Sequence, residues 1–111
     1  MTHDQGIARV ADVLERAAAL IEPEGAWTQN EYTHQLYAFC QLGAIAHVMA
    51  IGATKASGTP AARALSAFLD PTDESAGRVV ARWNDAPERT QAEVVSALRT
   101  AATLTRGSTD D

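Results

Sequence analysis

The sequence predicts an all-α protein, a compact bundle of four to five helices around a central apolar helix. The central helix is expected at 36–53, inside a run without Asp, Glu, Lys or Arg that extends from residue 32 to 54. On both sides of it, apolar residues recur at spacings of three and four, as they do on the buried face of a helix. A chain of 111 residues is long enough to form one domain with its own core. We therefore expect a single helical domain over 1–107 and a disordered acidic tail at 108–111.

The first helix is predicted at about 5–22. Its apolar stripe comprises Ile7, Val10, Ala11, Leu14, Ala17, Ala18 and Ile21. Asp4 is a suitable N-cap, because its carboxylate can accept hydrogen bonds from the free amides of the first turn. Pro23 ends the helix, because the residue before a proline is pushed out of the helical region.

A connector follows at 24–30, where turn-forming residues replace the helical period. Trp27 is its one large side chain, and we expect it to pack over the end of the first helix. The next stretch, 31–39, fits an extra helical turn, a short β-ribbon or irregular chain equally well.

The central helix is apolar most of the way round, which indicates enclosure by other helices or by lipid. A membrane span needs about 20 strongly apolar residues, whereas this run contains Gln41, His47 and several small residues. Enclosure by helices is therefore the prediction. Gly43 is expected to allow the close approach of a neighbouring backbone. His47 is expected to be a core histidine that hydrogen-bonds to a neighbouring segment.

Three further helices are predicted from their capping residues. A short helix at 60–69 starts at Thr59, a good N-cap, with a proline at the first helical position. A second short helix follows at 73–84, and its buried side comprises Ala76, Val79, Val80 and Trp83. The last helix is long, like the first and the central ones. It opens with a capping box, in which Thr90 and Glu93 each accept a hydrogen bond from the other's backbone amide.

Composition narrows the class of protein. The net charge of −5 argues against binding to nucleic acid, which draws on clustered Lys and Arg. A lone cysteine, Cys40, excludes an intramolecular disulfide, and the N-terminus lacks the basic and apolar regions of a signal peptide. The cytoplasm is therefore the expected compartment. Eight Arg against a single Lys, with abundant Ala, indicate GC-rich coding sequence and an actinobacterial or similar origin.

The chain also resembles a known family. The resemblance lies in LIE at 20–22 with WTQ at 27–29, FCQLGAI at 39–45, RWND at 82–85, RT at 89–90 and EV at 93–94. Their order is similar to that in a family of small uncharacterised domains found in actinobacteria and their phages. The resemblance covers most of the chain. It implies a compact fold and such a source, and it carries over no catalytic residue.

Cys40 is the candidate nucleophile of a thiol-dependent enzyme. At the start of a helix its thiolate would be stabilised by the helix dipole, and His34 with Asn84 or Asp85 would complete a Cys-His-Asn arrangement. The simpler interpretation is that Cys40 is a small buried hydrophobe at the top of a packed helix, because cysteine is among the most buried residue types. We therefore assign no catalytic residue and keep Cys40, His34 and Asp85 as weaker candidates.

No metal or other cofactor is predicted. The spacing among His3, His34, Cys40 and His47 matches no standard zinc ligand pattern.

Residues 83–85 form the most distinctive tripeptide, an apolar anchor followed by two side chains that cap turns. As structure, Trp83 would lie in the core, and Asn84 or Asp85 would bond to free amides before Thr90. As function, they would place an amide and a carboxylate at the edge of a cleft. The candidate binding residues are Trp27, Trp83, Asn84 and Asp85.

The leading functional hypothesis is a small non-enzymatic interaction or accessory module that binds another protein or itself. The alternative is a thiol-dependent enzyme centred on Cys40. A further alternative is a helix-turn-helix-like DNA binder at 90–104, which the acidic balance and the absence of a basic recognition helix weaken.

Self-association is expected from small apolar side chains on two helices. The first and last helices carry Ala17, Ala18, Ala19, Ala97, Ala101 and Ala102 beyond the stripe that one core contact needs. A homodimer would bury these alanines in a two-fold interface.

Overall fold

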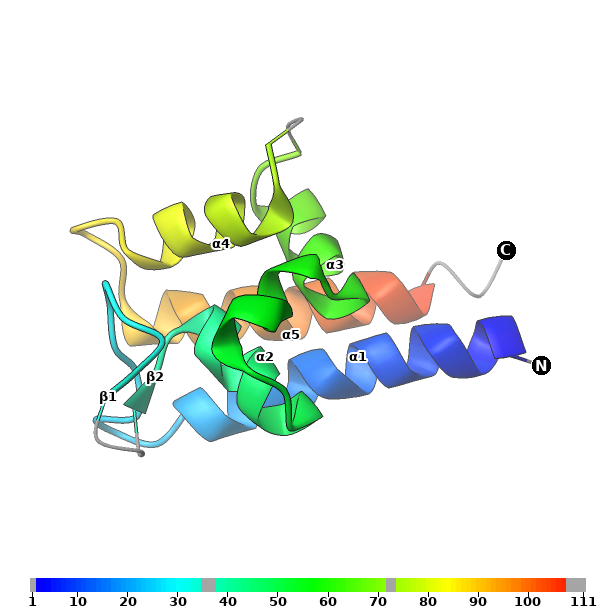
Figure 1. Cartoon of the computed structure of the whole chain (residues 1–111), viewed down its shortest axis with the longest axis horizontal. Coiled ribbons are helices and arrows are strands. Elements are labelled where there is room, and N and C mark those ends of the chain that lie inside the picture. Colours follow the sequence, from blue (N-terminus) through cyan, green and yellow to red (C-terminus); the bar gives the residue numbers. More distant parts are fainter. Residues whose placement is uncertain (1, 35–37, 72–73, 108–111) are drawn as a thin grey trace.

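The computed structural model describes residues 2–34, 38–71 and 74–107, with the backbone alone for 2–8 and 53 (Figure 1). Within these residues the fold is all-α, as predicted. The helices are α1 Thr2–Ile21, α2 Gln41–Met49, α3 Pro60–Leu69, α4 Ala76–Asn84 and α5 Gln91–Gly107, with the 3-10 helix η1 at Ala53–Gly58. Two short strands, β1 Thr33–His34 and β2 Ala38–Phe39, precede α2.

Helices α1 and α5 form an antiparallel pair at the base of the fold. The start of α1 and the end of α5 lie at the same end of the molecule (Figure 1), and the two helices contact each other extensively. Their buried apolar residues are Ala11, Val13, Leu14, Ala17, Ala18 and Ile21 of α1 and Val94, Val95, Ala97, Leu98, Ala101 and Ala102 of α5. The side chain of Ile7, the first residue of the predicted stripe, lies outside the described residues. This pair buries the stripes that the sequence predicts for the first and last helices.

The same packing corrects the expected role of the alanines. Only Ala19 is exposed among the six alanines predicted to join two copies. The other five, Ala17, Ala18, Ala97, Ala101 and Ala102, are at most 5% exposed, because the single chain packs them into its own core. The alanine surface assigned to a dimer is therefore used within one chain.

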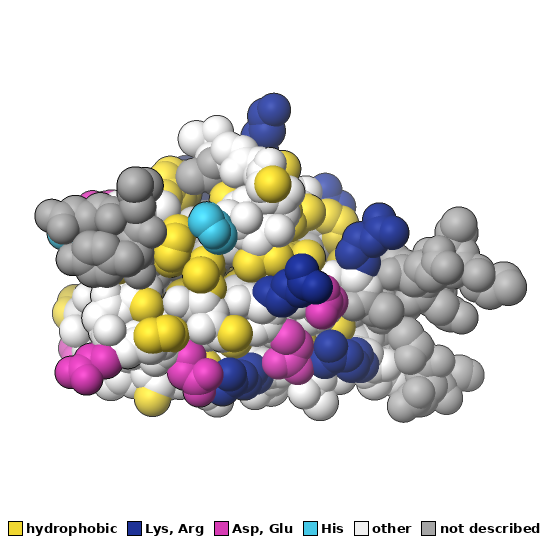
Figure 2. All heavy atoms as spheres, turned by 90° about the horizontal axis from the view of Figure 1, so that it is seen from below, with side chains coloured by type: hydrophobic (Ala, Val, Ile, Leu, Met, Phe, Trp, Pro, Cys, Tyr) yellow, Lys and Arg dark blue, Asp and Glu magenta, His cyan; other side chains and the backbone are white. Residues whose placement is uncertain are grey.

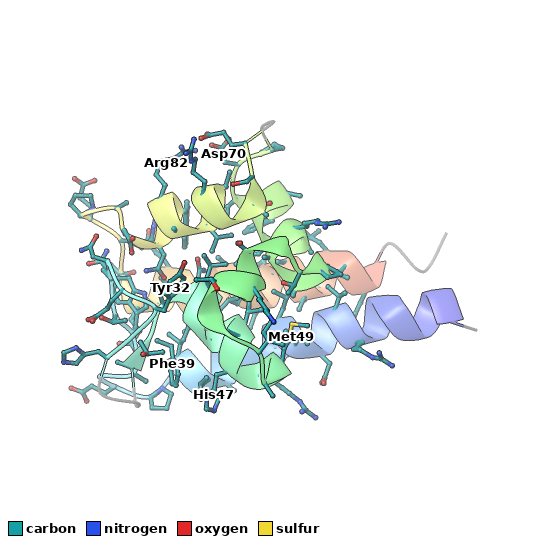
Figure 3. All side chains as sticks on the ribbon, in the orientation of Figure 1. Tyr32, Phe39, His47, Met49, Asp70 and Arg82 are labelled. Atoms are coloured by element: carbon teal, nitrogen blue, oxygen red, sulfur yellow. The ribbon has the colours of Figure 1, made fainter. Side chains whose placement is uncertain are left out.

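The remaining helices cover the α1–α5 pair. Helix α2 packs on α1, α3 packs on α5 and α1, and α4 packs on α3, α2 and η1. Figure 1 shows α4 as the layer farthest from α1. Gly77 of α4 permits a close approach to η1, because a Cβ there would collide with Ser57. Arg82 of α4 lies beside Asp70 at the end of α3, with a nitrogen–oxygen distance of 3.6 Å (Figure 3).

The central helix is shorter than predicted. Cys40 is its N-cap, and Ala50 adopts the left-handed conformation at φ 58° and ψ 44°, which ends α2 after nine residues. The prediction of a long helix at 36–53 is therefore wrong. Apolar and small residues continue past Ala50 as far as Ala53, so the pattern contains no sign of a break at Ala50. The predicted enclosure is confirmed for the first part of α2, since every residue from Gln41 to Ala46 is buried.

The stretch before α2 contains a short β-ribbon, one of the three possibilities left open. Strands β1 and β2 are antiparallel, with Thr33 opposite Phe39, while 35–37 lie outside the described residues. Gly43 packs against this region, because a Cβ on it would collide with the carbonyl oxygen of Tyr32. The predicted backbone approach at Gly43 is thus confirmed.

The capping residues in the sequence correctly predicted the starts of α3 and α5. The Thr59 hydroxyl accepts from an amide in the first turn of α3 at 3.2 Å. In the capping box, the Thr90 amide donates to the Glu93 carboxylate at 2.9 Å, and the Glu93 amide donates to the Thr90 hydroxyl at 3.1 Å. The start of α1 differs from the prediction. The helix begins at Thr2, so Asp4 lies inside it and is not its cap.

His47 is exposed, so the prediction of a core histidine is wrong. It lies in the last turn of α2, where its ring centroid is 5.1 Å from that of Phe39 (Figure 3). The helix buries its first six residues, and in its last turn Val48 and Met49 are half-buried against the core while His47 faces outward.

Ion pairs join the outer edges of α1 and α5. Arg99 donates two hydrogen bonds to the Glu22 carboxylate, at 3.1 and 2.9 Å. Arg106 donates to Glu15 at 2.9 Å. Figure 2 shows basic and acidic side chains intermixed along this side of the molecule.

Candidate functional site

Asn84, the last residue of α4, is fully buried and joins three segments of the chain. Its Oδ1 accepts from Nε1 of Trp27 at 3.0 Å and from the backbone amide of Gln41 at 3.1 Å. Its Nδ2 donates to the Thr28 carbonyl at 3.1 Å and to Oδ1 of Asp85 at 3.0 Å. One side-chain amide therefore connects α4, the connector and the start of α2. We call Trp27, Thr28, Gln41, Asn84 and Asp85 the Asn84 junction.

The connector closes over the turn that follows α4. Nε2 of Gln29 donates to the carbonyls of Asn84 and Ala86, at 3.0 and 2.8 Å. Asn30, with a left-handed φ of 65°, donates its amide to Oδ1 of Asp85 at 2.8 Å. The bond to the Asn84 carbonyl provides a partner for a backbone group at the end of α4, and the bond to Asp85 provides one for the Asn30 amide.

Trp83 lies next to the Asn84 junction and is half-buried, where a core position was predicted. Its carbonyl accepts from Nε of Arg89 at 2.9 Å, and the Arg89 guanidinium lies 3.6 Å from the centroid of its ring. This stacking is a cation–π contact. Arg89 thus stabilises the turn before Thr90 by binding back to Trp83 at the end of α4. The predicted bonds from Asn84 or Asp85 to that turn are replaced by their bonds to the connector and to α2.

Three of the four predicted binding residues therefore meet in one place. Trp27, Asn84 and Asp85 belong to the Asn84 junction, and Trp83 occupies the neighbouring turn. The polar atoms of Asn84 are fully used inside the chain, because its amide makes four hydrogen bonds. The described contacts of these residues are those of a structural joint between segments.

Cys40 lies at the edge of this joint, 6% exposed, and its Sγ accepts from the Gly43 amide at 3.3 Å. Burial raises the pKa of the thiol. The charge of Asp85 acts in the same direction, while hydrogen bonds from the Gly43 and Leu42 amides oppose it. A nucleophilic cysteine needs the reverse, a pKa low enough to give thiolate near neutral pH. The surroundings of Cys40 favour the neutral thiol.

His34, the other member of the candidate thiol site, is exposed on β1. Its Nδ1 lies 3.2 Å from Oε2 of Glu31. The side chain of His3 lies outside the described residues. Within the part of the chain that is described, no group of three His, Cys, Asp or Glu is placed to hold a metal ion.

A small hollow of about 160 Å³ lies beside Cys40. It is lined by Asn30, Glu31, Tyr32, Cys40, Leu42, Ala81 and Asp85. Pockets that bind small molecules are usually larger, about 300–1,000 Å³. This hollow is too small to enclose such a ligand.

A larger hollow, about 760 Å³, lies on the outer side of α5 next to the end of α1. We call it the α5 groove, and it is lined by Glu22, Glu24, Gln91, Ala92, Val95, Ser96, Arg99, Thr100 and Thr103. Gln91 fixes one end, because its Nε2 donates to the carbonyls of Ile21 and Pro23, both at 2.7 Å. The Glu22–Arg99 ion pair bridges α1 and α5 at the groove.

A second hollow, about 390 Å³, lies on the opposite side of α5. It is lined by Phe68, Trp83, Ala92, Glu93, Ser96 and Ala97, and we call it the Phe68 hollow. Phe68 is one of the few large apolar side chains left exposed, at 40%. Ala92 and Ser96 line both hollows. They and Thr100, one turn later, form a line of small side chains between the two, which we call the α5 ridge.

The sequence-based prediction did not include the α5 groove or the α5 ridge, because it placed binding at Trp27 and at 83–85. A signal for them exists in the sequence. Outside the apolar stripe of the last helix, small side chains recur every four residues, at Ala92, Ser96 and Thr100. A helix places residues at this spacing on one face. The flanking walls, in contrast, come from the segment that follows α1, from α3 and from α4, and only the tertiary structure brings these together.

No described helix combines the length and the apolar character that a membrane crossing requires.

Comparison with known proteins identifies the family of the chain. Searches of curated proteins and of solved structures each found no match. A family of unknown function, DUF6197, matches residues 7–104, which run from α1 into the last turns of α5. The match agrees with the resemblance to a family of uncharacterised domains noted from the sequence motifs. The chain belongs to the DUF6197 family of unknown function.

Proposed function

We propose that the protein is a small, non-enzymatic protein-interaction module, and that the α5 ridge with its two flanking hollows is the binding surface. One observation carries the proposal. A line of small side chains on α5 has a hollow of about 760 Å³ on one side and one of about 390 Å³ on the other. Two helices pack by placing the side-chain ridges of one into the grooves of the other. The surface thus has the shape that receives a helix.

The chemistry of this surface supports the same function. Ala92 and Val95 provide apolar contact in the α5 groove, and Phe68 and Trp83 provide it in the Phe68 hollow. Charged side chains stand among them. Protein interfaces combine an apolar centre, often containing aromatic residues, with a polar rim. An amphipathic helix is the class of partner that fits such a surface.

The ionisable groups of the α5 groove suit binding better than proton transfer. The hydrogen bond from Arg99, and then its charge, lower the pKa of Glu22. A general acid or base works best with a pKa near the working pH, whereas Glu22 is held as a carboxylate. Together with the raised pKa of the Cys40 thiol, this favours an interaction module over the thiol-dependent enzyme.

Site-specific photo-crosslinking tests the proposal. A p-benzoylphenylalanine in place of Thr103, an exposed residue that lines the α5 groove, is irradiated in cells of the source organism. We expect one or a few adducts of defined mass, because a bound partner would lie against the probe.

The matched control carries the probe in place of Arg78, an exposed residue of α4. It should give at most weak, diffuse adducts. The proposal fails if the Thr103 probe gives no defined adduct, or if both positions give the same adducts.

A further inference from the structure

We infer that the helix received by the α5 ridge is a basic amphipathic helix, which places Lys or Arg side chains beside its apolar face and over the start of α5. The inference rests on the proposed function, and it names the chemistry of the partner. It follows from negative charge that the described residues leave uncompensated at one end of the ridge.

Carboxylates outnumber cations among the side chains that line the two hollows. The α5 groove has Glu22 and Glu24 against Arg99, and the Phe68 hollow has Glu93. Arg99 donates two hydrogen bonds to Glu22, and Glu93 lies 3.7 Å from Arg89. The exposed Glu24 carboxylate makes no ion pair or hydrogen bond with the described part of the chain. Glu24 is therefore the carboxylate of this surface that a partner can neutralise.

A second unpaired carboxylate lies near the same end of the ridge. Glu88 is exposed in the turn before α5, and it makes no ion pair within residues 2–34, 38–71 and 74–107. The bonds from Gln91 to the carbonyls of Ile21 and Pro23 hold the segment that contains Glu24 against the start of α5. Both free carboxylates thus belong to segments that meet the first turn of α5.

The end of α1 adds to the negative potential at this place. Figure 1 shows that α1 ends beside the start of α5, and the C-terminus of a helix carries a partial negative charge. Gln91 bonds to the last carbonyls of α1 without adding a positive charge. The positive N-terminus of α5 is offset within the chain, because the Glu93 carboxylate accepts the Thr90 amide.

A cation on the partner fits this end of the ridge. Complementary charges across an interface steer the partner to its site and fix its register. Lys and Arg suit the edge of an apolar groove, because their stems cover apolar surface while their charged ends stay in water. Ala92 and Val95 would contact the apolar face of the partner helix, and a basic side chain at its flank would reach Glu24. An acidic flank would be repelled there.

A matched pair of synthetic peptides tests the inference. Each is a hydrocarbon-stapled helix of about 18 residues, or five turns, with one face of Leu and Ala. The flanking positions are all Lys in one peptide and all Glu in the other. Fluorescence anisotropy measures the binding of each labelled peptide to the full chain. We expect the Lys peptide to bind with a Kd roughly tenfold lower or more, and the difference to shrink as salt is added.

Charge reversal at Glu24 tests the contact itself. Glu24→Lys should raise the Kd of the Lys peptide roughly fivefold, which is the scale of an exposed ion pair that is reversed. The control Asp12→Lys makes the same change in net charge at an exposed residue of α1. It lies about 14 Å along the helix from Ile21, so it should leave most of the affinity.

A second pair of variants locates the binding surface. Ser96→Arg puts a long side chain on the α5 ridge and should abolish binding of the Lys peptide. Ala67→Arg adds the same side chain at an exposed position of α3 and should retain it. Circular dichroism of each variant checks that the helices are kept.

The outcomes separate this inference from the proposed function. The basic partner is overturned if the Glu peptide binds as tightly as the Lys peptide, or if Asp12→Lys weakens binding as much as Glu24→Lys does. It is also overturned if neither peptide binds. The Thr103 probe then decides the proposed function alone. An adduct with another protein, or with a second copy at twice the 11.8 kDa mass of the chain, leaves the interaction module standing, and the absence of any defined adduct removes it.

Discussion

At the scale of single residues, Asn84 shows how one amide fixes the course of the chain. Its oxygen accepts from the Trp27 indole and the Gln41 amide, and its nitrogen donates to Thr28 and Asp85. The site therefore needs an acceptor and a donor on the same short side chain. Among short side chains, only that of Asn combines an oxygen that accepts two hydrogen bonds with a nitrogen that donates two, since a Ser or Thr hydroxyl has a single donor.

Asn84→Asp tests this requirement. The carboxylate keeps the acceptor, but it loses the donor and faces the Thr28 carbonyl and the Asp85 carboxylate. We expect a loss of about 2–4 kcal/mol in the free energy of unfolding at neutral pH, since each buried polar group left without a partner costs about 1–3 kcal/mol. Urea denaturation at pH 7.5 and pH 4.5 measures it.

The stability deficit of Asn84→Asp should depend on pH, and its direction follows from the pKa of the introduced acid. Burial beside another carboxylate would raise the pKa of the introduced acid, so the protonated form, which can donate, is favoured in the folded state. The deficit relative to wild type should shrink as the pH falls and grow as it rises. Ala67→Asp, which adds a carboxylate at an exposed position of α3 away from the Asn84 junction, is the control. An equal deficit at both pH values would contradict the assigned donor role.

The sequence predicted the kind of role that residues 83–85 play, but not their partners. Asn and Asp were expected to cap a turn, and they do bond to backbone groups. The partners of Asn84, however, lie 57 and 43 residues away, at Trp27 and Gln41. The type of side chain reveals its capacity to bond, whereas its partner depends on which segments the fold brings together.

At the scale of helices, boundaries set by neighbouring residues were predicted and the boundary of α2 was not. Thr59 and the Thr90–Glu93 capping box mark helix starts by contacts within a few residues. Helix α2 ends at Ala50 in the left-handed conformation. Alanine gives no sequence signal for that conformation, which favours glycine, and tertiary packing must impose it.

Ala50→Gly should therefore stabilise the protein. Glycine adopts the left-handed region without the penalty that a Cβ incurs, and Ala50 is exposed, so little packing is lost. We expect a gain of about 0.5–1 kcal/mol in the free energy of unfolding, measured by urea denaturation. The same change at Ala67, exposed on the helical part of α3, should cost a comparable amount. If both variants have a lower free energy of unfolding than wild type, the left-handed conformation of Ala50 carries no strain that glycine relieves.

At the scale of the whole molecule, the pairing of α1 with α5 contributes to how the stability of the protein responds to acid. The hydrogen bond from Arg99, and secondly its charge, lower the pKa of Glu22, which joins these helices. A group with a lowered pKa stabilises the folded state above its unfolded pKa, and that stabilisation disappears as the pH falls through the folded value. The contribution of this exposed pair should also weaken with salt.

Glu22→Gln should make the Tm of the protein less dependent on pH in the acid range. The variant should have a lower Tm than wild type at pH 7, and the two Tm values should converge as the pH falls through the lowered pKa of the wild-type Glu22 carboxylate. Glu88→Gln removes an equal charge from an exposed turn and controls for net charge. If the Tm difference between Glu22→Gln and wild type stays constant from pH 7 to pH 3, the pair does not contribute to acid sensitivity.

The antiparallel pairing of α1 and α5 also bears on how the chain is made. Gln91 bonds to the carbonyl of Ile21 across 70 residues, and at about 5–20 residues per second the ribosome needs roughly 4–14 s to cover that distance. The apolar stripe of α1 leaves the ribosome before α5 does. A chain interrupted before α5 would keep that stripe uncovered on one side. Until α5 docks, this apolar stripe is therefore the kind of exposed surface on which chaperones act.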